Sequence, residues 1–465
     1  MRRALVTALI SLAGACEGPF VPPPASQATV ASVTLSPHAA VIRPGDTLRL
    51  QFTLRDASGD TLAGPVPAFT SRDLRVTTVS DDGLVRAVAF GTAWIVVAAD
   101  GHTDSTIIRV ASLTFASISA GGNHTCGTTT DGAVLCWGYN RYGQTGDGQT
   151  GAAVRFATPV VGLTGAEPVA GGNHTCALQG GGGATMCWGW NQSGQLGTAT
   201  PGDRSEPALV IADVTFTALT AGGQHTCALT ESGEAYCWGL NADGQVGDTS
   251  FHNQFAPVPV AAGLRFTTLS AGGRHTCGIT TDSLAYCWGA NEFGQVGDST
   301  TTHRSSPTRV AGDYRFVAIA SGRFHSCALT AAGTAYCWGY NGRHQLGTAT
   351  PDSAAHQPVA VDGTQQFATV TAGGLHTCAL LTDGTAYCWG HNALGQVGDS
   401  TTADASAPTA VRTAAHFVTL HTFGDHTCGM STTGRAYCWG FGGTGELGTG
   451  LLAGSTYPVL VAGQP

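Results

Sequence analysis

The sequence predicts an all-β protein in which a small β-sandwich precedes a seven-bladed β-propeller. A unit of about 50 residues, containing His-x-Cys and then Cys-Trp-Gly, occurs seven times. Such a period is typical of solenoids, arrays and propellers. Each unit holds short β-patterned runs between glycine-rich turns, without helical periodicity. Four strands per unit and seven units predict the propeller over residues 112–465.

Two cysteines in each unit flank a predicted hairpin. In CALTAAGTAYCWG (327–339), Cys327 and Cys337 are equally distant from the turn. Directly opposed residues of antiparallel strands lie roughly 4.5–5.5 Å apart at Cα, which a disulfide accepts. One disulfide per blade is therefore expected. The expected pairs are Cys126–Cys136, Cys176–Cys187, Cys227–Cys237, Cys277–Cys287, Cys327–Cys337, Cys378–Cys388 and Cys428–Cys438.

Zinc binding is the alternative for these cysteines. Side chains at i and i+2 share a strand face, so His325, Cys327 and the opposed Cys337 could converge as three ligands. An oxidising compartment favours the disulfides, and the N-terminus indicates export. Each closed loop is short, so each bond should contribute near the low end of about 2–4 kcal/mol.

Residues 1–16 have the layout of a signal peptide, with Arg2, Arg3, an apolar run and small residues before Cys16. The stretch LAGAC resembles a bacterial lipobox, which implies lipidation of Cys16; ordinary secretion is the alternative. The run is too short to span a bilayer, so we expect any membrane attachment to be through lipid alone. Residues 17–27 form a proline-rich linker.

Residues 28–111 contain short strands separated by Pro-Gly, Ser-Gly and Asp-Gly turns, as in a β-sandwich. The order resembles the bacterial immunoglobulin-like group-two domain of surface proteins. That resemblance implies an immunoglobulin-like sandwich that acts as a spacer. The residues that carry it are Val33, Pro37, Gly45, Gly83, Gly91 and Ala93, with Phe69 where tryptophan is frequent.

The propeller unit, AGGxHTCALTxxGxAYCWGxNxxGQxG, resembles the regulator of chromosome condensation repeat from Leu113 to about Gly463. The resemblance implies a seven-bladed propeller. The family's founding member exchanges guanine nucleotide on a small GTPase, and another relative is a secreted β-lactamase inhibitor. Exchange-factor-like regulation and enzyme inhibition are therefore the alternative functions.

Composition excludes several kinds of chemistry. The net charge is −9 and all 21 basic residues are arginine, which excludes a Walker P-loop lysine, a Schiff base and a Ser-Lys nucleophile. No basic cluster favours nucleic acid. We expect no enzyme activity, no cofactor and no metal.

Two repeated polar features are better explained by structural roles than by functional ones. The histidine of each unit is expected to be structural, for example by bonding the backbone of a neighbouring turn. The aspartates of the Trp-Gly loops could indicate calcium, but ordinary glycine turns are favoured because two units carry threonine there. The aspartates are Asp147, Asp248, Asp298 and Asp399, and the threonines are Thr198 and Thr348.

Function is expected where the units differ from one another, at positions that should form rings near one end of the propeller. Tyrosine, tryptophan, phenylalanine and arginine there are typical of protein-binding surfaces. The alternative is that these positions merely tolerate change. We expect a monomeric extracytoplasmic scaffold with an unidentified protein partner. The candidate residues are Tyr139, Tyr142, Trp190, Arg274, Phe293, Phe324, Tyr340, His391 and Phe441.

Overall fold

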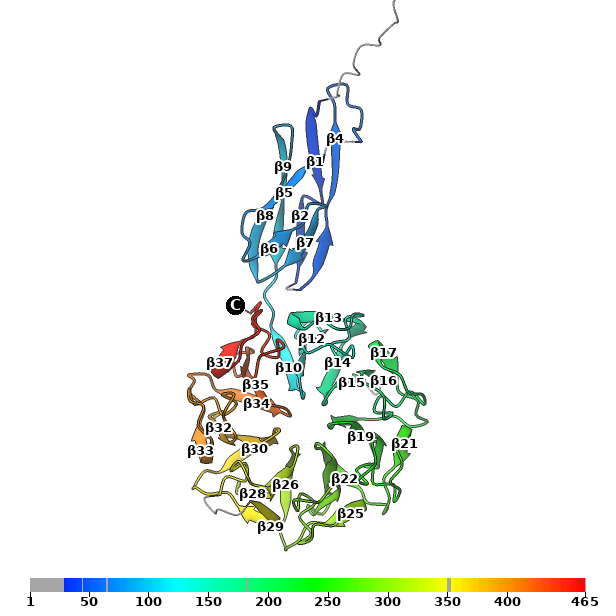
Figure 1. Ribbon diagram of the computed structural model, residues 1–465, viewed down its shortest axis with the longest axis vertical. Helices are drawn as coiled ribbons and strands as arrows, with labels where there is room; N and C mark the ends of the chain where they lie inside the picture. The colour runs from blue at the N-terminus through cyan, green and yellow to red at the C-terminus, as the bar shows by residue number, and fades with distance from the viewer. Residues whose placement is uncertain (1–28, 44, 64–65, 181–182, 349–352, 465) are drawn as a thin grey trace, which may run out of the picture.

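The computed structural model describes residues 29–43, 45–63, 66–180, 183–348 and 353–464. Throughout these ranges the secondary structure is β, arranged as an elongated sandwich beside a ring of seven sheets (Figure 1). The predicted signal peptide, Cys16 and the linker lie outside the described residues. The described part of the chain has no helix long and apolar enough to cross a membrane.

The N-terminal domain is an immunoglobulin-like sandwich of three small sheets. Its strands alternate buried and exposed residues; in β8 the side chains of Ile95 and Val97 are fully buried, as expected for a sheet with one face on a core. The sheets are β1 (Ser32–Ser36) with β4 (Gln51–Arg55); β2 (Ala39–Ile42), β9 (His102–Val110), β8 (Gly91–Ala99) and β5 (Ala68–Ser71); and β3 (Thr47–Arg49), β7 (Leu84–Ala87) and β6 (Thr77–Val79).

Seven four-stranded antiparallel sheets form the propeller, each from four consecutive strands. Blades 1 to 3 are β10 (Phe115–Ala120), β11 (His124–Thr129), β12 (Ala133–Gly138) and β13 (Val154–Thr164); β14 (Ala166–Ala170), β15 (His174–Gln179), β16 (Thr185–Gly189) and β17 (Arg204–Leu209); and β18 (Ala218–Ala221), β19 (His225–Leu229), β20 (Ala235–Gly239) and β21 (Gln254–Pro259).

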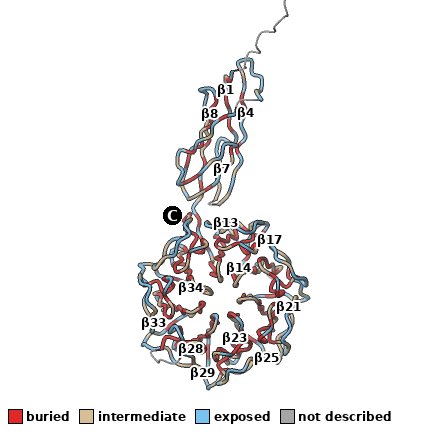
Figure 2. Tube along the Cα trace, viewed as in Figure 1, coloured by how far each residue is buried: buried red, intermediate tan, exposed pale blue. Residues whose placement is uncertain are grey.

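Blades 4 and 5 are β22 (Phe266–Ala271), β23 (His275–Thr280), β24 (Ala285–Gly289) and β25 (Arg304–Arg309); and β26 (Phe316–Ser321), β27 (His325–Thr330), β28 (Ala335–Tyr340) and β29 (Ala354–Ala360). Blades 6 and 7 are β30 (Phe367–Ala372), β31 (His376–Leu381), β32 (Ala386–Gly390) and β33 (Ala405–Ala410); and β34 (Phe417–Thr422), β35 (His426–Ser431), β36 (Ala436–Gly440) and β37 (Ser455–Leu460). Buried residues concentrate in the middle strands of each blade (Figure 2).

Each blade contains the disulfide that the spacing predicts, with Cα separations of 4.0–4.1 Å and fully buried cysteines. Cys327 and Cys337 are directly opposed in the β27–β28 register. In the same register Tyr336 lies opposite Ala328 and Trp338 opposite Ser326, so bulky side chains face small ones. His325 does not join the two sulfurs, because its ring bonds to the next blade.

The interface between blades is the same hydrogen-bonded unit, repeated around the ring. Between blades 3 and 4, the Thr276 hydroxyl donates to the Gln245 backbone carbonyl at 2.9 Å, and Trp288 Nε1 donates to the same oxygen at 3.0 Å. His225 Nε2 lies 2.9 Å from the Thr276 hydroxyl. Because that hydroxyl gives its one proton to the carbonyl, His225 must be the donor, which fixes the Nε2–H tautomer.

The repeat histidines are structural, as expected. Their partner differs from the expected one, because each histidine bonds a hydroxyl group of the next blade rather than the backbone of a turn. The same unit also closes the ring without strand exchange. His426 of blade 7 lies 2.9 Å from the Thr125 hydroxyl of blade 1, which donates to the Glu446 carbonyl. The same set of residues in each repeat, a cysteine, a histidine, a hydroxyl residue and a tryptophan, therefore forms seven equivalent interfaces, including the one that closes the ring.

The Gly-Gly turns add a backbone ring inside this one. Gly122, Gly172 and their equivalents donate N–H bonds of 2.8–3.1 Å to the next blade, and Gly424 closes the circle on Gly121. A Cβ on Gly172 would lie 2.4 Å from the Gly223 oxygen. At Gly172 the blades approach too closely for a side chain, which explains the glycine pair of that blade; blade 5 departs from the pair with Arg323 and blade 7 with Phe423.

The sandwich contacts the first blade, and the segment that enters the propeller contacts the C-terminal segment. Arg43 forms an ion pair with Asp131, and the Leu113 amide donates to the Gly463 carbonyl at 2.6 Å. The C-terminal segment therefore meets the entry to blade 1, beside the sandwich (Figure 1).

Candidate functional site: the loop face of the propeller

One end of the propeller carries the loops that follow each Trp-Gly, and we call it the loop face. Its loops, restricted to described residues, are 139–153, 190–203, 240–253, 290–303, 340–348, 391–404 and 441–454. The turns that precede each repeat histidine lie at the same end, because the strand of the histidine pairs with the strand of Trp-Gly. The loop face therefore contains every candidate residue predicted from the sequence.

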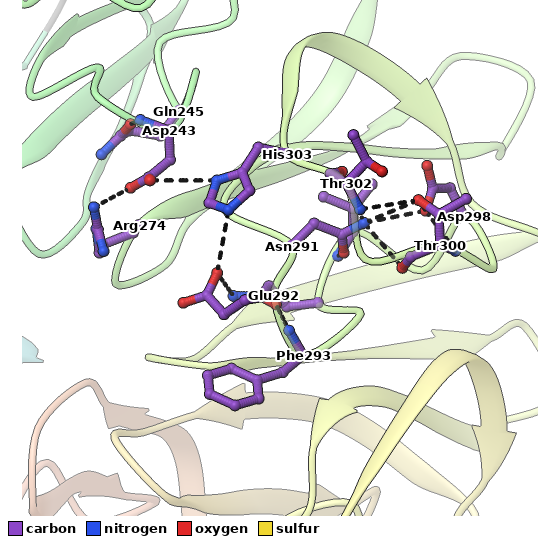
Figure 3. Close-up of polar contacts among 12 residues, drawn as sticks. Asp243, Gln245, Arg274, Asn291, Glu292, Phe293, Asp298, Thr300, Thr302 and His303 are labelled. Atoms are coloured by element: carbon purple, nitrogen blue, oxygen red, sulfur yellow. Dashed lines mark hydrogen bonds and ion pairs between the residues drawn. The ribbon is translucent and has the colours of Figure 1, made fainter.

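A buried asparagine and a buried glutamine organise the loop in each of blades 1 to 6, whereas blade 7 carries Gly442 and Glu446 at these positions. In blade 4 the Asn291 side chain accepts from the Val296 amide at 2.9 Å and donates to Asp298 at 3.2 Å (Figure 3). Gln295 Oε1 accepts from the Phe293 amide at 2.9 Å. The aspartate thus accepts a side-chain hydrogen bond within an ordinary turn, and the residue at position 293 is held where its side chain leaves the loop.

The blade 4–5 aromatic cluster consists of Phe293, Phe324 and Tyr340, all half-buried. The Phe293 ring centroid lies 5.7 Å from that of Phe324 and 5.0 Å from that of Tyr340. The exposed Arg323 guanidinium lies 5.1 Å from the Phe324 centroid. That distance is within the range of a cation–π contact.

A second group, the blade 1–2 aromatic cluster, has the same composition. Tyr142 packs against Tyr139 and Trp190 with centroid separations of 6.2 and 5.9 Å. The exposed Arg141 guanidinium lies 5.9 Å from the Tyr142 centroid. The loop face therefore presents two aromatic clusters, each with its own arginine.

A polar network lies beside the blade 4–5 cluster (Figure 3). Asp243, whose side chain is only 10% exposed, is 2.5 Å from Arg274 Nη2 and 3.3 Å from His303 Nδ1. His303 Nε2 is 4.0 Å from Glu292. Burial raises the pKa of Asp243 above its ordinary value, while Arg274 and His303 act in the opposite direction.

The network depends on residues that the other blades do not carry at the positions of His303 and Asp243. At the position of His303, Asp203, Asn253 and Asp404 accept a hydrogen bond from the asparagine amide of their own loop. His303 instead turns to Asp243 of the preceding blade. Asp243 itself stands where the other blades carry Tyr142, Ser193, Phe293, Arg343, Leu394 and Thr444. Blades 3 and 4 are therefore specialised at their common edge.

The structure brings together six of the nine candidate residues in the two aromatic clusters, and a seventh, Arg274, in the polar network. The other two stand apart: His391 Nδ1 accepts from Gln396 at 2.9 Å, and Phe441 lies over Gly443. The expected continuous ring is thus two clusters and a polar network. Sequence reasoning missed Arg141, Glu292, His303 and Arg323; only Arg323 had a visible signature, because it replaces the second glycine of a Gly-Gly turn.

Neither a metal site nor a large central pocket is found where the structure is described. In that part of the chain no three histidine, cysteine or carboxylate side chains are grouped to hold a metal ion. The inner strands enclose a cavity of about 150 Å³ lined mainly by alanine, serine and threonine. Such a volume suits a few water molecules.

Family models match both parts of the chain. The RCC1-like domain matches residues 169–464, the regulator of chromosome condensation (RCC1) repeat matches 115–144, and the bacterial Ig-like domain (group 2) matches 29–110. The chain therefore belongs to the RCC1-like propeller family and carries an N-terminal group 2 Ig-like domain. This domain and the seven disulfides indicate an extracytoplasmic protein.

Several known proteins are similar to the propeller. The probable E3 ubiquitin-protein ligase HERC3 of Homo sapiens is 30% identical over 125 residues, which are 26% of this chain and 12% of that protein. Human WBSCR16 has a TM-score of 0.64 at 21% identity, over 70% of this chain and 89% of that one. Yeast RCC1 (Prp20) has a TM-score of 0.59 at 24% identity, over 66% and 78%. The chain thus spans about an eighth of the curated relative, and the structural similarities show the fold.

Proposed function

We propose that this protein is a non-enzymatic extracytoplasmic scaffold that binds a protein partner through the loop face of its propeller. The observation that carries the proposal is the pair of half-exposed aromatic clusters on one face, each with an arginine held over a ring. Tyrosine, tryptophan and arginine are the residues on which binding energy most often concentrates.

The repeated polar residues support a binding role rather than catalysis. Each repeat histidine donates to the next blade, as His225 does to Thr276, and each repeat cysteine is in a disulfide. These groups are committed to the scaffold. A propeller of the same fold, yeast RCC1 (Prp20), has been solved bound to Kap60, which is a precedent for protein binding.

Attachment to the cell envelope through a lipid on Cys16 is part of the proposal, with the Ig-like domain as spacer. Replacing Cys16→Ser in a bacterial host should release the protein from the membrane fraction into the soluble fraction. A wild-type protein that is already soluble would contradict the anchor, without affecting the proposed loop-face function.

The binding role is tested by capture of partners from bacterial cell and culture extracts with the full chain. The double variant Trp190→Ala/Tyr340→Ala should lose the captured protein. Leu209→Ala is the matched control, because Leu209 is 57% exposed at the end of β17 remote from the loop face. Equal capture by the wild type and the double variant would overturn the proposal.

A further inference from the structure

Resting on the proposed function, we infer that the loop face binds an acidic protein segment, whose carboxylates meet Arg141 and Arg323 while its apolar side chains cover the two aromatic clusters. The charged groups of the loop face that have no partner within the chain decide which kind of protein segment the face prefers.

Most charges near the clusters have internal partners. Asp243 is paired with Arg274 and His303, Glu292 faces His303, and Arg343 pairs with Asp404 at 3.4 Å. Arg274 and Arg343 are each paired with a carboxylate, so these contacts leave no free cation in the group.

Arg141 and Arg323 are different, because neither pairs with a carboxylate among the described residues. Both are exposed, and both lie over an aromatic ring. In a chain whose net charge is −9, each aromatic cluster thus carries one unneutralised cation. An arginine held by a ring loses less conformational freedom when it pairs with a carboxylate.

The backbone also fixes where Arg323 stands. It replaces a glycine of the inner backbone ring, and its amide donates to the Gly373 carbonyl at 3.1 Å. Its Cα and Cγ lie beside Gly273, which precedes Arg274. Arg323 is therefore anchored at the edge between blades 4 and 5, next to the polar network and over the aromatic cluster.

Among the turns that precede the repeat histidines, the acidic residue is Asp425, which is in blade 7 and belongs to neither cluster. The cationic sites are therefore confined to blades 1–2 and 4–5, on nearly opposite sides of the ring (Figure 1). A partner that engages both must present two acidic positions, and two-point contact gives orientation as well as affinity.

The test uses three synthetic 12-residue peptides that share a central Phe-Leu pair and are otherwise filled with glutamate, glutamine or lysine. Binding to the full chain is measured by fluorescence polarisation at low and high salt. The glutamate peptide should bind roughly tenfold more tightly than the glutamine peptide at low salt and lose that advantage at high salt. Arg323→Gln should remove most of the advantage.

Arg435→Gln is the matched control, because Arg435 lies in the β35–β36 turn, at the opposite end of the blade. Tryptophan fluorescence should show that both variants keep the fold. Equal binding of the glutamate and glutamine peptides, tighter binding of the lysine peptide, or equal effects of the two variants would overturn the inference. Tighter binding of an acidic polysaccharide such as polygalacturonate would also overturn it, since the anion would then not be a protein.

Binding through the loop face and the preference for an acidic segment can be contradicted independently of each other. A captured partner that is lost with Trp190→Ala/Tyr340→Ala but is insensitive to salt and to Arg323→Gln would leave the binding face intact and remove only its acidic preference.

Discussion

Mild acid should unfold the propeller, because seven histidines are buried in their neutral form at the blade interfaces. Burial lowers the pKa to about 3 for six of them, from His124 to His376, and to about 4 for His426. Each ring uses Nε2–H to bond a hydroxyl, while the buried Nδ1 has no hydrogen-bond partner among the described residues. A proton on Nδ1 would place a buried charge without a partner.

The direction in which the free energy of unfolding changes with pH follows from the linkage between proton binding and folding. The unfolded chain has histidines of pKa about 6.5 and takes up protons first as the pH falls, so stability is full above that value and is lost below it. At pH 5.5 each histidine would cost roughly 1 kcal/mol, and the seven together on the order of 7–10 kcal/mol. That is comparable to the whole stability of a typical domain.

The number of protons taken up on unfolding, which is the slope of the free energy against pH, is a more specific prediction than the free energy itself. Unfolding at pH 5.5 should take up about 7 protons, nearly one for each of these seven histidines and for His421, because burial also lowers the pKa of His421 to about 4. Burial raises the pKa of Asp243 and Glu446, so their proton uptake in the folded state offsets this by up to about 2. Aspartates whose pKa is lowered, such as Asp298, titrate below this window.

The assay is urea unfolding at pH 7.5, 6.5 and 5.5 with disulfides intact, followed by the fluorescence of the buried tryptophans. His225→Gln keeps an N–H for Thr276 but cannot titrate, so its slope of free energy against pH should fall by about one proton. Leu209→Ala, an exposed position that changes no titratable group, should leave the slope unchanged. A free energy that is flat from pH 7.5 to 5.5 would refute the reasoning.

Three further changes test the scaffold, each by urea unfolding. Trp338→Ala removes a fully buried indole and should cost about 3–5 kcal/mol, while the half-buried Tyr340→Ala should cost about 1 kcal/mol; equal losses would place Tyr340 in the core. Glu446→Gln restores the residue of the other blades and should stabilise by about 1 kcal/mol, increasingly as pH rises, because burial raises the pKa of Glu446; a loss at pH 8 would contradict this. Replacing Cys227 and Cys237 by alanine should cost about 2–3 kcal/mol; free thiols in the wild type would contradict the disulfide.

The scaffold was largely predictable because it is encoded locally. The ten-residue spacing of Cys327 and Cys337 sets the hairpin register, and the register sets the disulfide. The number of repeats gives the number of blades. These features depend only on contacts within one unit, which a single unit's sequence contains.

Contacts between units were not predictable in the same way. His225 bonds Thr276, 51 positions away, and nothing in one unit shows which group of the next lies opposite. The pattern was nevertheless present, because a hydroxyl residue follows every repeat histidine. Ring closure through His426 and Thr125 is the same contact at a separation of 301 residues.

The candidate site was predictable in part. Variation between units identified Phe293, Phe324 and Tyr340, but not that they would contact one another across blades. His303 was missed because its position normally bonds within its own loop, and its pairing with Asp243 depends on substitutions in two blades at once. A single sequence shows each substitution but not their convergence.

The affinity of the captured partner for the full chain and its Phe324→Ala variant tests the binding face most directly. Phe324 belongs to the blade 4–5 cluster and contacts Phe293, Tyr340 and Arg323. Calorimetric titration should show a loss of roughly thirtyfold, equivalent to about 2 kcal/mol, while Leu209→Ala should bind as the wild type does. An unchanged dissociation constant for Phe324→Ala, with its fold intact, would contradict a partner-binding role for this face.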